Sequence, residues 1–142
     1  MVARISTNSA ISVVNAMVDS FDEGAGANAK LQIWSGERPT AIDDATTTQV
    51  LLVEYDLPNP SFGTATASAI GATAVAEEIT TVDALATGEA AWFRVLDTDG
   101  DIQMDGTVTA ATGDGDLKIS STAITAAVKV AVVSWSVSIA KG

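Results

Sequence analysis

The segment from Trp92 to Val108 constrains the fold of this chain more than any other part of the sequence. It reads as an apolar stretch, Trp-Phe-Arg-Val-Leu, followed by the acidic stretch Asp-Thr-Asp-Gly-Asp and then by a second apolar stretch. Asp and Gly tolerate the left-handed backbone geometry that tight hairpin turns require. The segment therefore predicts a β-hairpin of residues 90–96 and 102–109, and a chain that is mainly β.

Further strands are expected on both sides of this hairpin. Residues 30–34 alternate as a short strand, and residues 49–57 form a strongly apolar strand that ends before Pro58. The last strand is expected to run from about Ile124 to Ile139, with a bulge at Val132–Val133, where the apolar pattern changes face. About eight strands at close spacing favour an antiparallel β-sandwich with a jelly-roll-like form.

One helix is expected before the strands, over residues 9–23. Asn8 or Ser9 is a suitable N-cap, and Gly24 follows the expected C-terminal end. The apolar residues that recur at helical spacing on one face are Ile11, Val14, Val18 and Phe21. This face has two interpretations, docking onto the chain's own sheet or contact with a neighbouring subunit. Residues 1–8 are interpreted as an N-terminal arm, and residues 9–142 as a single domain.

The absence of both Cys and His excludes several kinds of chemistry. Disulfides, thiolate metal sites, cysteine nucleophiles and serine–histidine triads cannot be formed, so we expect no enzyme, no cofactor and no metal site. The aspartates of Asp97–Asp105 do not match a calcium-binding EF-hand loop, because neither starting position supplies both the required Gly and the required Glu. They are interpreted as turn residues, and weak calcium binding stays open as an alternative.

The formal net charge of −11 argues against two classes of partner. A strongly acidic chain is repelled by nucleic acid and by anionic membrane surfaces, so neither is expected to bind. The N-terminal residues do not form the apolar core of a signal peptide, and no apolar run approaches the roughly 20 residues that span a bilayer. These features favour synthesis in a cytoplasm without export.

Single residues on strands add to the candidate interface. Trp34 is expected to anchor the core or an interface. Arg94 is the one cation in a strong strand, and we expect it to form a cross-strand ion pair with Asp105 or a salt bridge between subunits. The candidate partner-binding residues are Arg4, Ile11, Val14, Val18, Phe21, Trp34 and Arg94.

Several motifs follow one another in a specific order along the chain. They are Ala-Lys-Leu-Gln-Ile-Trp-Ser-Gly at 29–36, the acidic loop at 42–45, Leu-Leu-Val-Glu at 51–54, Pro-Ser-Phe-Gly at 60–63, Ala-Trp-Phe-Arg-Val at 91–95, Met-Asp-Gly at 104–106 and Asp-Leu-Lys-Ile-Ser-Ser-Thr at 116–122. In this order the chain resembles a family of small, mostly uncharacterised virion structural proteins of tailed bacteriophages. The resemblance implies a head-associated structural protein, such as a decoration or cement protein, and supplies no catalytic residues.

This resemblance leads to one main hypothesis and two alternatives. The main hypothesis is a decoration protein on the outer capsid surface that binds and stabilises the major capsid protein. It would act as a homo-oligomer, for example a trimer at a local symmetry axis, with contacts from residues 1–8 and from the apolar helix face. The alternatives are a neck or tail component, and a carbohydrate-binding β-sandwich module that uses exposed Trp side chains.

Overall fold

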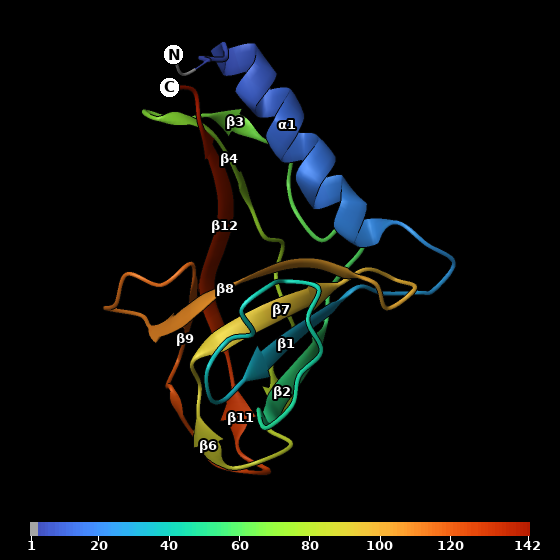
Figure 1. Ribbon diagram of the computed structural model, residues 1–142, viewed down its shortest axis with the longest axis vertical. Coiled ribbons are helices and arrows are strands. Elements are labelled where there is room, and N and C mark those ends of the chain that lie inside the picture. The colour runs from blue at the N-terminus through green and yellow to red at the C-terminus, as the bar shows by residue number, and fades with distance from the viewer. Residues whose placement is uncertain (1–2) are drawn as a thin grey trace.

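The computed structural model describes residues 3–142 and confirms a mainly β chain with one N-terminal helix (Figure 1). The helix α1 (Thr7–Asp19) continues into a short 3₁₀ turn, η1 (Ser20–Asp22). The strands are β1 (Lys30–Trp34), β2 (Leu51–Asp56), β3 (Thr66–Ala67), β4 (Gly71–Val75), β5 (Val82–Asp83), β6 (Gly88–Glu89), β7 (Trp92–Leu96), β8 (Ile102–Ala110), β9 (Leu117–Ile119), β10 (Ala123–Ile124), β11 (Lys129–Val130) and β12 (Val132–Ala140).

Eight of these strands form one hydrogen-bonded sheet in the order β2-β1-β7-β8-β9-β12-β4-β3. The other four form two small two-stranded sheets, β10 with β6 and β11 with β5. All neighbouring strands are antiparallel except β8 and β9, which are parallel. The mainly antiparallel architecture is confirmed. The jelly-roll form is not, because the long strands follow one continuous order that includes a parallel pair.

The expected hairpin is confirmed as β7 and β8. Its turn is held by the carboxylate of Asp97, which accepts hydrogen bonds from the backbone N–H groups of Asp99 and Asp101 at 3.0 and 2.9 Å and from the side chain of Gln103 at 2.8 Å. Gly100 has a φ of 90°, a left-handed conformation that glycine adopts without steric cost. The acidic composition of the turn therefore has a structural explanation in these bonds.

A connection of only a few residues joins the parallel strands β8 and β9. Parallel neighbours usually need a crossover of a dozen or more residues. Here the short loop of residues 111–116 returns the chain to the side of β8. The Thr109 hydroxyl accepts a hydrogen bond from the N–H of Gly115 in this loop at 3.1 Å. A Cβ added at Gly115 would lie 2.8 Å from the Thr109 methyl group, so only glycine allows this close approach. At the end of the connection, Asp116 accepts hydrogen bonds from the N–H and the hydroxyl of Thr107.

The expectation of one long last strand is wrong in its first part. The chain between Ile124 and Lys129 turns, with Ala127 at a φ of 63°, and the residues around this turn belong to β10 and β11, which pair with β6 and β5. Only β12 joins the main sheet. The bulge is confirmed, because the register of β12 against β9 shifts between Val132 and Ser134.

The helix starts two residues earlier than expected and ends earlier. Ser6 is the N-cap and accepts a hydrogen bond from the N–H of Ser9, so the expected caps Asn8 and Ser9 lie inside α1. The expected arm of residues 1–8 is shortened accordingly: residues 1–2 lie outside the described residues, and residues 7–8 are helical. The N–H of Ile5 donates to the carbonyl of Lys141 at 3.1 Å, which ties this segment to the end of β12.

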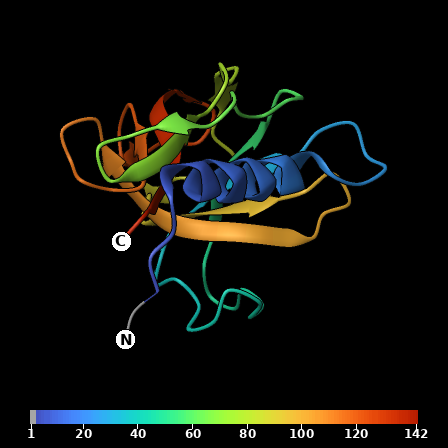
Figure 2. The ribbon, with the colours of Figure 1, turned by 90° about the horizontal axis from the view of Figure 1, so that it is seen from above.

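The apolar face of α1 packs on β4 and β12 of its own chain. Val14, Val18 and Phe21 are buried there, and the Phe21 ring stacks on Trp135 with 6.3 Å between ring centroids. Trp135 also contacts Phe93 of β7 edge to face at 5.6 Å, so it joins the helix to the hairpin side of the core. As a result, α1 covers one end of the molecule, next to the C-terminus (Figure 2).

Candidate interaction sites

Two tryptophans stack on the sheet face that points away from the main core. Leu31 and Ile33 of β1 point into the core, so the alternating residue Trp34 lies on the opposite face. It pairs with Trp92 of β7 in register, and the two rings stack with 5.6 Å between centroids. Trp34 is half-buried and Trp92 is 1% exposed. The pair is therefore a second apolar contact that the chain itself covers.

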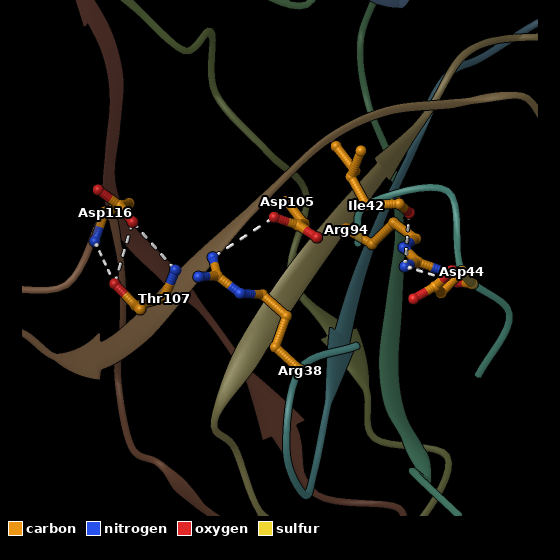
Figure 3. A network of polar contacts seen from close by, with 7 residues as sticks. All are labelled: Arg38, Ile42, Asp44, Arg94, Asp105, Thr107 and Asp116. Atoms are coloured by element: carbon orange, nitrogen blue, oxygen red, sulfur yellow. Dashed lines mark hydrogen bonds and ion pairs between the residues drawn. The ribbon is translucent and has the colours of Figure 1, made fainter. Parts of the chain in front are cut away.

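Arg94 lies beside this aromatic pair and is bonded to the polar loop of residues 35–50, as Figure 3 shows for the loop. Its guanidinium lies 5.1 Å from the ring centroid of Trp92, within the range of a cation–π interaction. The same group donates hydrogen bonds to the carbonyl oxygens of Ile42 at 3.0 Å and Asp44 at 3.3 Å. Because Arg94 is only 4% exposed, these bonds hold the loop against the sheet as part of the folded chain.

The expected ion pair between Arg94 and Asp105 is wrong. The two residues are opposite each other in the β7–β8 register, but the Asp105 carboxylate is 3.4 Å from the guanidinium of Arg38. Arg38 comes from the loop that covers this face, and the same loop provides the carbonyl groups that Arg94 contacts (Figure 3). The sequence pattern predicts a separate polar loop here. In the structure, this loop provides the partners of both Arg94 and Asp105.

Most of the candidate partner-binding residues make contacts within the chain. Val14, Val18 and Phe21 belong to the core, and Ile11 is partly buried against it. This arrangement is the first of the two interpretations of the apolar helix face, docking onto the chain's own sheet. Arg94 is buried under the loop, so a salt bridge from it to another subunit is excluded in this conformation. Arg4 is exposed and lies against the C-terminal Gly142.

The largest exposed apolar side chains at the opposite end of the molecule lie in two adjacent loops. Leu85 is 62% exposed and Val128 is 53% exposed. The loops are joined by backbone hydrogen bonds, from the N–H of Ala84 to the carbonyl of Val128 and from the N–H of Ala127 to the carbonyl of Ala84, both at 2.9 Å. We call the residues 84–88 and 125–128 the distal tip, because they connect the small strands β5, β6, β10 and β11, farthest from α1 (Figure 1).

The two loops of the distal tip are uncharged, as is the longer stretch of residues 57–76. The loops contain no Asp, Glu, Lys or Arg, although the whole chain has a net charge of −11. The nearest ion pair is at the base of the tip, where Lys129 lies 3.2 Å from Asp83. Ala127 has a positive φ of 63°, which costs a non-glycine residue about 1–2 kcal/mol.

Sequence reasoning missed the distal tip because residues 125–128 were assigned to the last strand. The pattern predicts an apolar strand face for Val128, whereas it is exposed in a turn. Composition gives no signal for the tip either, because the uncharged run 119–128 is shorter than the uncharged run 57–76.

The described residues 3–142 contain no group of three or more His, Cys, Asp and Glu residues that could hold a metal ion. In the same part of the chain, no helix has the length and apolar character needed to cross a membrane. Comparisons with protein-family models, with characterised proteins and with solved structures find no match to this chain.

Proposed function

We propose that this protein is a non-enzymatic structural component of a tailed-bacteriophage particle, a decoration protein that binds the outer surface of the major capsid protein. The observation that carries this proposal is the distal tip. There, Leu85 and Val128 are exposed on two loops that are hydrogen-bonded to each other and contain no charged residue.

Such a surface suits docking onto a protein partner. Burying apolar side chains such as Leu85 and Val128 gains about 25 cal/mol per Å² of surface removed from water, and no charge has to be desolvated. The backbone bonds between the two loops order them before binding, which lowers the entropy cost of association. The tip therefore provides an ordered apolar contact surface for a protein partner.

The charge of the remaining surface supports an outer position on the particle. A net charge of −11 opposes contact with DNA inside a capsid and keeps neighbouring molecules soluble at high local concentration. The proposal includes a homo-oligomer, such as a trimer, that presents several distal tips to the shell at once. Sedimentation equilibrium of the purified protein measures this oligomeric state.

A neck or tail position is the alternative within the same structural role. Quantitative mass spectrometry of purified particles separates the two, because decoration requires a copy number comparable to that of the major capsid protein. The carbohydrate-binding alternative has less support, since Trp92 is 1% exposed and Trp34 stacks on it. Sugar stacking requires an exposed aromatic face.

The direct test uses particles assembled without this protein and adds back purified variants. We expect Leu85→Asp to reduce particle binding at least tenfold, because a charge would be buried in the interface without a partner. The matched control is Ile70→Asp, since Ile70 is also 62% exposed but lies in the β3–β4 turn near α1. Equal binding of Leu85→Asp and the unmodified protein would remove the distal tip from the interface.

A further inference from the structure

The β2 strand forms an open edge of the main sheet. In the sheet order it has β1 on one side and no strand of the main sheet on the other, where β5 of a small sheet lies close to part of it. Val53 and Tyr55 pair with β1, and the N–H of Leu57 also bonds to that side, at the carbonyl of Ala29. Because backbone groups alternate along a strand, those of Glu54 and Asp56 point outward.

Only one position on this outward edge has a backbone partner. The carbonyl of Leu52 accepts a hydrogen bond from the N–H of Leu85 at 2.7 Å. Within residues 3–142, the outward N–H and C=O groups of Glu54 and Asp56 have no backbone hydrogen-bond partner. An edge of this kind is a template for another extended segment.

A groove of about 410 Å³ runs along this edge. Its opposite wall is the extended segment 78–82, whose alternate residues Glu78, Thr80 and Val82 line the groove. The remaining lining residues are Asn28, Glu54, Asp56, Leu57 and Pro58. The groove therefore combines free backbone groups on one wall with side chains at the two-residue spacing of an extended chain on the other.

The charge of the groove indicates which kind of peptide can bind in it. Three of its lining residues, Glu54, Asp56 and Glu78, are acidic and none is basic. One cation already approaches it, since the ammonium group of Lys30 donates a hydrogen bond to Asp56, and this bond raises the pKa of Lys30. Pairing with the β2 edge of a second copy would place Glu54 and Asp56 opposite the same residues, which is destabilising.

We propose that the open edge of β2 binds an extended peptide segment rich in Lys or Arg, which adds a strand to the sheet. Its backbone pairs with the outward N–H and C=O groups of Glu54 and Asp56. Its basic side chains pair with Glu54, Asp56 and Glu78, while Val82 contacts its apolar side chains. The partner is a protein with an exposed basic strand or tail, and this interaction is separate from the contact made by the distal tip.

The test uses the whole protein and the capped peptide acetyl-Thr-Lys-Val-Lys-Val-Lys-Thr-amide. We expect titration calorimetry to detect binding that weakens with added salt, and no binding of the peptide in which Glu replaces each Lys. Glu78→Gln should weaken binding about threefold. Glu77→Gln is the matched control, since Glu77 is equally exposed and adjacent but does not line the groove, and it should bind as the unmodified protein does.

A second pair of variants tests the backbone pairing. Glu54→Pro removes an outward N–H without breaking a bond to β1, so we expect loss of at least tenfold in affinity, whereas Glu54→Gln should lose about threefold. If the proline variant does not fold, amide hydrogen exchange of the unmodified protein provides the same test. We expect the backbone N–H groups of Glu54 and Asp56 to exchange more slowly when the peptide is added. Unchanged exchange there, equal binding of the Lys and Glu peptides, or self-association through β2 would overturn the proposal.

Discussion

Arg94 lies directly opposite Asp105 in the β7–β8 register, yet each residue is bonded to the loop of residues 35–50. The guanidinium of Arg94 donates to two carbonyl groups of this loop, and the carboxylate of Asp105 accepts from Arg38 of the same loop. These two strand residues therefore attach the irregular loop to the sheet. The two attachments differ in burial, because Arg94 is buried and the Arg38 side chain is 45% exposed.

This difference in burial predicts how much each arginine contributes to the free energy of unfolding. Arg94→Met should lower the free energy of unfolding by about 2–3 kcal/mol, because two hydrogen bonds from a charged, buried donor are lost. Arg38→Met should lower it by less than about 1 kcal/mol, since an exposed ion pair contributes little. Urea unfolding measures both values. Similar effects of the two substitutions would show that the burial of Arg94 does not govern the attachment of the loop.

The buried hydroxyl of Tyr55 predicts both a stability change and a pH dependence. It donates to the carbonyl of Val130 at 2.8 Å, so Tyr55→Phe should cost about 1–2 kcal/mol at neutral pH. Burial raises the pKa of Tyr55 above its ordinary value near 10. Its contribution is therefore complete below pH 10 and is lost as the pH rises further, because the unfolded chain releases this proton first.

The measurement for Tyr55 is urea unfolding at a series of pH values. The stability difference between the unmodified protein and Tyr55→Phe should shrink as the pH rises above about 10. Tyr55 is the single tyrosine of the chain, so absorbance of the phenolate reports its ionisation directly. A constant difference up to pH 11.5 would contradict the raised pKa.

The packing of α1 and η1 predicts a large contrast between a buried and an exposed residue of this helical segment. Phe21→Ala should destabilise the fold by about 3–5 kcal/mol, because the ring is buried against Phe62 and Trp135. Val13→Ala, on the exposed face of α1, should change stability by no more than about 0.5 kcal/mol. Thermal and urea unfolding followed by far-UV circular dichroism give both values. A small effect at Phe21 would mean that the helix is not docked in solution.

The turn at Ala127 predicts a stabilising substitution. Ala127→Gly should raise the free energy of unfolding by up to about 1 kcal/mol, since glycine adopts a φ of 63° without a steric penalty. Ala126→Gly should lower the free energy of unfolding by about 0.4–1 kcal/mol, because glycine there only increases the conformational entropy of the unfolded chain. The comparison is made by urea unfolding. Destabilisation by both glycines would argue against the left-handed turn.

The β7–β8 hairpin was predictable because its signals are local. The alternation of apolar residues and the Asp and Gly residues of the turn are all contained in 90–109, and the same residues form the bonds that hold the turn. The apolar stripe of α1 was also evident. Its partner strands were not, because the stripe indicates docking onto a sheet of the same chain or onto a neighbouring subunit without identifying β4 and β12.

The parts that sequence reasoning missed depend on distant or unmarked features. The left-handed turn at Ala127 has no signal, because alanine is not a residue that marks such geometry. The partners of Arg94 are backbone carbonyl groups about 50 residues away in the chain, and only the folded loop brings them into reach. The open β2 edge depends on the order of strands, which local periodicity does not determine.

The parallel connection between β8 and β9 has a consequence for how fast the chain folds. The strands β7, β8 and β9 contact one another within residues 92–119, whereas β12 pairs with β4 through Ser138 and Thr73, 65 residues apart. Closing short loops costs less entropy, so we expect the three local strands to form the folding nucleus and the β4–β12 pairing to form late. Substitutions in the hairpin should then slow folding, and substitutions in β4 should mainly speed unfolding, which stopped-flow kinetics in urea can distinguish. A growing chain would therefore leave part of the apolar side of α1 uncovered until β12 has been synthesised.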